Sequence, residues 1–139
     1  MRAPYTQLYV HLIWSTRDRL ELISEAIERP LRAAIAAKCQ ELKCDLVAIG
    51  GVPDHIHLLV RLHPAVSISE LVKQVKGSSS HLITHKINPD GFFKWQGAYR
   101  AFTVRKADAP RVMKYIEHQK AHHAEKTINK DWEITGSDE

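Results

Sequence analysis

Hydrophobic and polar residues alternate along residues 7–15, which is the pattern of a half-buried β-strand. Its polar face carries Gln7, Tyr9, His11 and Ser15, and Ile13 interrupts that face. Residues 45–49 and 54–60 show two further strand patterns, with a glycine- and proline-containing turn between them. We therefore expect these two strands to form an antiparallel hairpin, and we expect a fourth strand over residues 98–104.

Three segments have helical spacing instead. Ser24 can cap the first, in which apolar residues recur every three or four positions between residues 27 and 42. Ser67 and Glu70 form a capping box for the second, which extends to about residue 83. Pro110 suits the first turn of the third, which we predict over residues 111–125.

The predicted order is strand, helix, strand, strand, helix, strand, helix. This order favours the α+β class, specifically a ferredoxin-like sandwich whose antiparallel sheet has its first two helices on one face. The third helix is then an addition at the C-terminal end. A length of 139 residues suits a single domain over residues 1–139, with about 126–139 as a polar, loosely held tail.

Composition narrows the class of protein only slightly. The net charge is +4 and the isoelectric point is about 9.1, which is compatible with a polyanionic partner without requiring one. Cys39 and Cys44 have no metal or redox spacing, so we interpret them as reduced core thiols. No signal peptide opens the chain and no apolar run is long enough to span a membrane, so we expect a cytoplasmic protein without a membrane partner.

Basic and small residues gather in places that suit a nucleic acid. Residues 17–19 are either a phosphate-binding loop or a solvated turn, and the small residues at 77–80 would admit either a DNA strand or a packed helix. Dense aromatic residues over 92–99 are typical of core packing, with base stacking as the alternative. The candidate DNA-binding residues are Arg17, Arg19, Lys73, Lys76, Ser78, Arg100 and Lys114.

The predicted strand over residues 54–60 carries a pair of reactive side chains. His55 and His57 are two residues apart, so they point to the same face, about 7 Å apart along the strand. Two such imidazoles can bind one cation if a third ligand comes from elsewhere. A bare His-x-His pair on a strand is more often structural than metal-binding, so the interpretation depends on a second stretch.

That second stretch is residues 115–119, in the last predicted helix. Tyr115 and Gln119 are four residues apart and share a helix face, so a metal held by His55, His57 and the Gln119 oxygen would lie close to the tyrosine hydroxyl. Imidazole and oxygen ligands together suit Mg²⁺ or Mn²⁺, with the nitrogens favouring Mn²⁺.

A tyrosine at such a site predicts a covalent reaction. Its oxygen can attack a phosphodiester to give a phosphotyrosine, which conserves the energy of the broken bond for later rejoining. This favours strand transfer over degradation. His118, His122 and His123 lie nearby in the sequence, and each is either a competing ligand, a proton acceptor for the tyrosine, or part of a polar helix end.

Three stretches together resemble a known family. They are residues 53–59, residues 95–99, and residues 115–119 followed by His122 and His123. In these the chain is similar to the IS200/IS605 family of Y1 transposases, which belong to the HUH single-stranded DNA nucleases. The similarity covers most of the chain, from the first strand through the tyrosine-bearing helix.

The resemblance implies specific roles. His55 and His57 would be the HUH metal ligands, Gln119 the third ligand and Tyr115 the nucleophile. It also implies a ferredoxin-like fold and a homodimer in which the tyrosine helix of one subunit can complete the other's active site. Members cut single strands beside subterminal hairpins and leave a 5′-phosphotyrosine and a free 3′-hydroxyl.

Two other functions remain open from the sequence. One is a domesticated DNA hairpin-binding protein, similar to the transposase-like proteins associated with repetitive extragenic palindromes. The other is a metal-dependent phosphodiesterase in which water attacks and Tyr115 only packs. The expected function is an active transposase, because every expected catalytic residue type is present.

Overall fold

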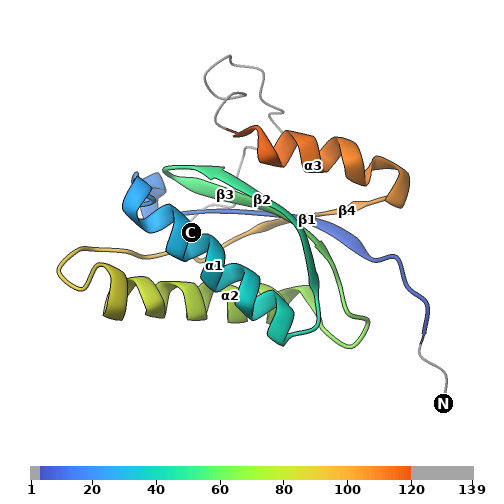
Figure 1. The fold of residues 1–139 in the computed structure, drawn as a ribbon, viewed down its shortest axis with the longest axis horizontal. Helices are drawn as coiled ribbons and strands as arrows, with labels where there is room; N and C mark the ends of the chain where they lie inside the picture. The colour runs from blue at the N-terminus through green and yellow to red at the C-terminus, as the bar shows by residue number, and fades with distance from the viewer. Residues whose placement is uncertain (1–3, 120–139) are drawn as a thin grey trace.

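The computed structural model describes residues 4–119 (Figure 1). Four strands and three α-helices make up this part of the chain. The strands are β1 (Tyr9–Ser15), β2 (Asp45–Val52), β3 (His55–Arg61) and β4 (Arg100–Val104). The helices are α1 (Glu25–Glu41), α2 (Ile68–Leu82) and α3 (Ala109–Glu117), with short 3-10 turns at Arg17–Arg19 and Lys106–Asp108 and a π-helical turn at Ile83–Ile87.

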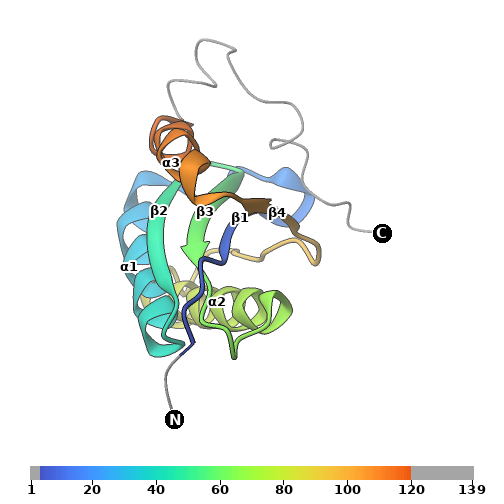
Figure 2. The ribbon, with the colours of Figure 1, turned by 90° about the vertical axis from the view of Figure 1, so that its right-hand side faces the viewer.

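The strands form one antiparallel sheet in the order β2-β3-β1-β4. Helices α1 and α2 cover one face of this sheet, and α3 lies on the other face (Figures 1 and 2). The predicted ferredoxin-like α+β fold is therefore confirmed, and helix α3 follows β4.

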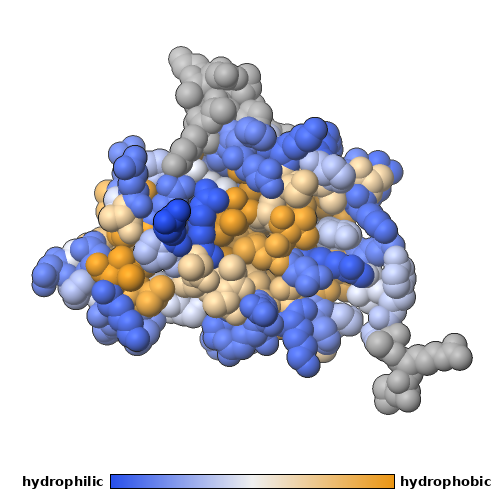
Figure 3. Space-filling view, in the orientation of Figure 1, coloured by the Kyte–Doolittle hydropathy of each residue, from blue (hydrophilic) through white to orange (hydrophobic). Residues whose placement is uncertain are grey.

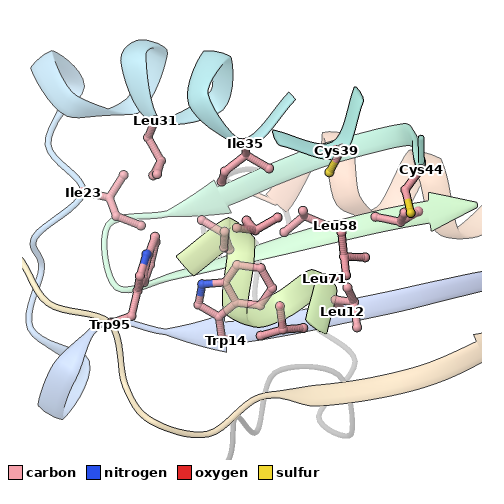
Figure 4. Packing of buried hydrophobic residues seen from close by; sticks show 14 of the residues in the cluster. Leu12, Trp14, Ile23, Leu31, Ile35, Cys39, Cys44, Leu58, Leu71 and Trp95 are labelled. Carbon is pink, nitrogen blue, oxygen red and sulfur yellow. The ribbon is translucent and has the colours of Figure 1, made fainter. Parts of the chain in front are cut away.

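The larger core lies between the sheet and the first two helices (Figure 4). Leu12 and Trp14 of β1 and Leu58 of β3 point into it, because these residues share one side of the pleat. Leu31 of α1 and Leu71 of α2 meet them from the helical layer. Cys39 and Cys44 are buried and free, in agreement with their interpretation as core thiols; burial and then the neighbouring Cys44 raise the pKa of Cys39 to about 12.

A smaller core holds α3 against the opposite face. Val112 and Ile116 pack there with Ala48 of β2 and Leu59 of β3. Helix α3 is strongly amphipathic, since its three buried residues recur at the spacing of one helix face. This small apolar contact fixes where Tyr115 lies relative to the sheet.

The hairpin between β2 and β3 is tighter than the sequence predicts. Gly50 and Gly51 continue β2 as far as Val52, and only Pro53 and Asp54 form the turn. Glycine is needed at position 50 because a β-carbon there would overlap the carbonyl oxygen of Ile116, so Gly50 admits the backbone of α3. A β-carbon on Gly51 would instead meet the carbonyl oxygen of His55 within the hairpin.

Core packing explains why most of the aromatic and small residues occur where they do from α2 to β4. Phe93 and Trp95 are buried in the larger core, and Trp95 Nε1 donates a hydrogen bond of 3.0 Å to Ser79 Oγ. Ser79 is fully buried, so a small side chain is required at that position of α2. Gly77 differs, because a β-carbon there would meet no other atom within 4 Å.

Helix α3 begins close to its predicted start and ends at Glu117, whereas the sequence prediction extends it to residue 125. His118 has φ −108° and ψ 30°, which are not helical values. Gln119 therefore follows a break in the helix. Residues 120–125, His122 and His123 among them, and the predicted tail at 126–139 lie outside the described residues.

The surface between α1 and α3 is partly apolar. Figure 3 shows hydrophobic side chains gathered there, where β2 forms one edge of the sheet. Leu46, Val47, Ile49 and Val52 of this strand are half-buried. Within residues 4–119, no helix is both long and apolar enough to span a lipid bilayer.

Candidate functional site

The two histidines of β3 lie side by side on the sheet face that α3 covers. Both are fully buried, and their ring centroids are 5.2 Å apart. Ile56 and Leu58, their neighbours in sequence, point into the opposite core. The predicted alternation of this strand is confirmed, and it brings two imidazoles to one face.

Tyr115 reaches the same place from α3. Its ring centroid is 5.9 Å from that of His57, in an edge-on arrangement. The position follows from the packing of Ile116, whose carbonyl group covers Gly50, the β2 residue paired with His57. The tyrosine is half-buried, so solvent reaches its side of the site.

Gln119 lies just past the end of α3 and is only 1% exposed. Its Nε2 donates a hydrogen bond of 3.2 Å to the carbonyl oxygen of Tyr115. Its Oε1 is buried and has no hydrogen-bond partner among the described residues. Leaving a buried carbonyl oxygen unsatisfied costs about 1–3 kcal/mol, so such an atom is expected to serve a purpose.

His55 has an acidic neighbour behind it. Its Nδ1 is 2.6 Å from Asp54 Oδ1 and 3.4 Å from Arg19 Nη2. The shorter contact is to a carboxylate, which can only accept, so we place the proton on Nδ1. A metal would then bind through Nε2 of His55, in the usual carboxylate–histidine arrangement.

Arg19 is held by this acidic group. Its Nε is 3.5 Å from Asp54 Oδ2, although the Arg19 side chain is still 42% exposed. Asp18 and Arg19 both have φ of 54°, a left-handed backbone conformation that residues other than glycine rarely adopt. Strain of this kind tends to collect at functional sites. Arg17, the other arginine of this turn, is exposed.

His57 has a second histidine behind it, from β1. His11 Nε2 is 2.9 Å from His57 Nδ1, and His11 is itself fully buried. The sequence places His11 on the polar face of the first strand, but its partner could not be read from that pattern. The sequence does give one indication of this contact: the first strand and the hairpin each carry histidine on a single strand face.

The candidate DNA-binding residues fall into two groups. Lys73, Lys76 and Ser78 come from α2, on the face of the sheet opposite the histidines. Lys73 is exposed, but Lys76 Nζ donates to the carbonyl oxygens of Gln96 at 2.7 Å and Ala98 at 2.9 Å. Ser78 Oγ donates to the carbonyl of Val75 at 3.3 Å. Lys76 therefore braces the segment before β4.

Arg100 and Lys114 lie on the histidine side. Arg100 of β4 and His57 of β3 both pair with Ile13 of the intervening β1, so they are two strand spacings, about 10 Å, apart. The Arg100 guanidinium lies 5.5 Å from the centre of the Phe102 ring. Lys114 is exposed on α3, next to Tyr115 in sequence.

The residues present fit a divalent cation of the magnesium type. No group of three or more histidine, cysteine, aspartate or glutamate side chains within residues 4–119 is arranged to hold a metal. A site built on His55 and His57 therefore needs a different third donor. The buried Oε1 of Gln119, which has no hydrogen-bond partner among the described residues, is a neutral oxygen of the type that suits Mg²⁺ or Mn²⁺ in combination with imidazole.

Comparison with known families identifies the class of protein to which this sheet and its tyrosine-histidine site belong. Residues 4–119 match the family described as "Transposase IS200 like". The match covers most of the chain. The protein belongs to the IS200-like transposase family.

Curated relatives agree with this assignment. The chain is 27% identical over 118 residues to the ISDra2 transposase TnpA of Deinococcus radiodurans, covering 81% of this chain and 84% of that one. It is 25% identical over 115 residues to the transposase for insertion sequence element IS200 of Salmonella typhimurium, covering 78% and 74%.

Solved structures share the fold. A Deinococcus radiodurans R1 protein assigned as a transposase superposes with a TM-score of 0.63 at 27% identity, over 86% of this chain and 95% of that one. A REP-associated tyrosine transposase bound to a REP hairpin gives a TM-score of 0.68 at 18% identity, over 97% and 79%. The second of these likenesses concerns the fold alone.

Proposed function

We propose that this transposase cleaves and rejoins single-stranded DNA at the ends of an insertion sequence, through a covalent 5′-phosphotyrosine on Tyr115. The observation that carries the proposal is the position of the Tyr115 ring, 5.9 Å from the ring of His57 on the histidine-bearing face of the sheet. A tyrosine needed only for packing would not have to be half-exposed beside two buried imidazoles.

His55, His57 and Gln119 are the proposed ligands of a Mg²⁺ or Mn²⁺ ion. Both imidazoles have their Nδ1 in contact with another side chain, so each would bind through Nε2. When bound, the ion polarises the scissile phosphodiester and offsets the negative charge that develops on it.

Tyr115 is the proposed nucleophile. Its phenolic oxygen forms a bond to phosphorus, the bond from phosphorus to the 3′-oxygen breaks, and the phenolic proton passes through solvent to the departing 3′-oxygen. The products are a 5′-phosphotyrosine and a free 3′-hydroxyl. His118 is exposed and its Nδ1 contacts the Lys114 carbonyl at 2.7 Å, so we assign it no part in this step.

Rejoining reverses the same exchange. The 3′-hydroxyl of another strand attacks phosphorus, the bond from phosphorus to the Tyr115 oxygen breaks, and the tyrosine recovers a proton. The number of phosphoester bonds is unchanged in each step, so strand transfer requires no nucleotide cofactor. A half-exposed Tyr115 leaves room for the incoming strand.

The proposed partner is single-stranded DNA with subterminal hairpins. A structural neighbour of the same fold is bound to a REP hairpin, which supports a folded single strand as ligand here. Arg17, Arg19, Arg100 and Lys114 would contact DNA near the site, and Lys73 and Ser78 would contact it along α2. The predicted contact through Lys76 is not proposed, because its ammonium group already donates to the carbonyl oxygens of Gln96 and Ala98. Contacts of this kind are mainly to phosphates and position the strand.

A homodimer in the cytoplasm completes the proposal. The partly apolar surface along β2 is of the kind that a partner chain covers, and the family resemblance implies that this partner is a second copy. Chromosomal DNA as substrate requires that the protein reach the cytoplasm. Light scattering of the purified protein would test the dimer, and a monomeric mass at micromolar concentration would contradict it.

The reaction itself is tested by a denaturing-gel experiment. Purified protein is incubated with Mn²⁺ or Mg²⁺ and with labelled single strands that span both flanks of its own gene. Tyr115→Phe and His57→Ala serve as variants. We expect a metal-dependent covalent protein–DNA adduct that both variants lose.

Two results would contradict the proposal. Free cleaved DNA with Tyr115→Phe still active would indicate that water is the nucleophile and that the protein is a phosphodiesterase. Tight hairpin binding without cleavage, under all metal conditions, would indicate a domesticated binding protein.

A further inference from the structure

His11 is a buried histidine that the proposed reaction does not use directly. It lies in the middle of β1, opposite Leu59 of β3 and Phe102 of β4, and it is fully buried. A buried imidazole is costly unless it is hydrogen-bonded, and the strand has no positional need for one. Its presence therefore calls for a specific partner.

That partner is His57. His11 Nε2 and His57 Nδ1 are 2.9 Å apart, and the two rings are tilted by 33° with their centroids 5.1 Å apart. Because His57 pairs with Ile13, the two histidines are diagonal neighbours on one face of adjacent strands. Phe102 contacts the His11 ring from β4 at a centroid distance of 6.3 Å and limits its rotation.

The chemistry of a metal ligand determines the direction of this hydrogen bond. An imidazole that binds a cation through Nε2 is neutral and carries its proton on Nδ1. His57 Nδ1–H must then donate, and His11 Nε2 must accept, which requires His11 to carry its own proton on Nδ1. Of the two possible directions of this hydrogen bond, only this one is compatible with metal binding through Nε2 of His57.

We infer that His11 is a positioning residue for the metal site, which accepts the His57 Nδ1–H hydrogen bond and so fixes both the tautomer and the ring orientation of that ligand. The inference rests on the proposed assignment of His57 as a metal ligand. His11 does not touch metal or DNA in this role.

The two ligands would then be oriented by different acceptors. Asp54, which accepts from His55, lies at the hairpin turn with 27% of its side chain exposed, where a charge is tolerated. His11 lies in the sheet interior, where a carboxylate would pay a large desolvation cost. A neutral imidazole is the acceptor that suits the buried position.

The test measures metal binding by the full-length protein, separately from DNA cleavage. Mn²⁺ affinity is measured by electron paramagnetic resonance for wild type, His11→Phe, His11→Gln and His57→Ala. Phenylalanine keeps an aromatic ring of similar size but removes the acceptor, whereas glutamine retains an acceptor. Leu12→Val, on the opposite face of the same strand, controls for lost packing.

We expect His11→Phe to raise the Mn²⁺ dissociation constant about 10- to 100-fold, in the range seen when a metal ligand loses its hydrogen-bond partner. His11→Gln should recover most of the affinity, and Leu12→Val should bind as wild type does. Equal affinity of folded His11→Phe and wild type would overturn the inference.

A second measurement keeps the inference testable if His11→Phe does not fold. The ¹⁵N chemical shifts of His57 in the metal-free wild-type protein report which ring nitrogen carries the proton. A proton on Nδ1 is expected, and a proton on Nε2 would overturn the role of His11. If wild type and His57→Ala both fail to bind Mn²⁺, the metal site of the proposed function is itself wrong.

Discussion

The carbonyl oxygen of Ile116 occupies the space in which a side chain on Gly50 would begin. Gly50 pairs with His57 in the hairpin, and Ile116 directly follows Tyr115 in α3. The contact between Gly50 and Ile116 therefore sets the distance between α3 and the sheet, next to both Tyr115 and His57. A glycine that the sequence suggests is part of a turn instead determines how closely the tyrosine approaches the histidines.

Replacing Gly50 with alanine should displace α3. The added β-carbon cannot fit beneath the Ile116 carbonyl, so we expect a loss of roughly 1–3 kcal/mol in unfolding free energy, as for other overpacked sites. Adduct formation should fall by more than stability alone explains, because Tyr115 moves. Urea unfolding and the denaturing-gel assay measure the two effects.

Gly77→Ala is the matched control for this change. Position 77 lies within α2 and a β-carbon there meets no neighbour, so the same substitution should raise stability by about 0.5–1 kcal/mol through helix propensity. Similar effects of the two substitutions would show that Gly50 has no special contact.

Gln119→Met should separate stability from metal binding. Methionine has similar length and removes both the unsatisfied Oε1 and the Nε2 hydrogen bond to Tyr115. Since an unsatisfied buried oxygen costs about 1–3 kcal/mol and an ordinary hydrogen bond contributes about 1 kcal/mol, we expect the metal-free variant to be as stable as wild type or slightly more stable. Its Mn²⁺ affinity should nevertheless fall sharply.

Calorimetry of metal-free protein and Mn²⁺ titration would measure both quantities for Gln119→Met. A variant that binds Mn²⁺ normally would exclude Gln119 as a ligand. A variant that loses stability by several kcal/mol would indicate that Oε1 has a structural partner.

Arg17 and Arg19 should have different roles although they are two residues apart. Arg19 contacts Asp54, which contacts His55, so Arg19→Ala should weaken Mn²⁺ binding, by about 10-fold if it acts as other outer contacts of metal ligands do. Arg17 is exposed, so Arg17→Ala should leave metal binding unchanged. It should lower the slope of log affinity for DNA against log salt concentration by about one, the loss of a single phosphate contact.

Fluorescence anisotropy at several salt concentrations, together with Mn²⁺ titration, distinguishes these roles. In combination with Asp54→Asn, the effect of Arg19→Ala on Mn²⁺ affinity should be less than additive. Additive effects would mean that Arg19 does not act through Asp54.

Cys39 and Cys44 should not react with thiol reagents in the folded protein. Burial and then the neighbouring Cys44 raise the pKa of Cys39 to about 12, and only the thiolate is reactive. At pH 8 its thiolate fraction is then about one in ten thousand. Ellman's reagent should therefore detect neither thiol in native protein and both after unfolding; rapid reaction of the native protein would contradict the buried position.

The sequence predicts the sheet and its two faces well because each strand has a local signal. Alternation in β1 and β3 places His55 and His57 on one face, and the structure has the same arrangement. The Ser67 half of the predicted capping box is also present, since Ser67 Oγ accepts from the Glu70 backbone N–H, while the Glu70 carboxylate accepts from Gln74 instead. These features depend on residues close in the chain.

The features that the sequence does not reveal depend on contacts across the fold. Gly50 and Gly51 have the composition of a turn, and only the contact with the Ile116 backbone explains why glycine is needed at position 50 of β2. The hydrogen bond between His11 and His57 joins residues 46 positions apart. Lys76 has the spacing of a surface cation, yet its ammonium group is held by two carbonyls of the segment before β4.

The site depends on the register of strand β3. The same seven residues supply core side chains to one face and both histidines to the other, with only Pro53 and Asp54 between this strand and β2. An insertion of one residue that shifts the register of this strand would leave its composition intact and exchange its faces. Natural variation in length should therefore be absent from this hairpin, even where single substitutions are tolerated.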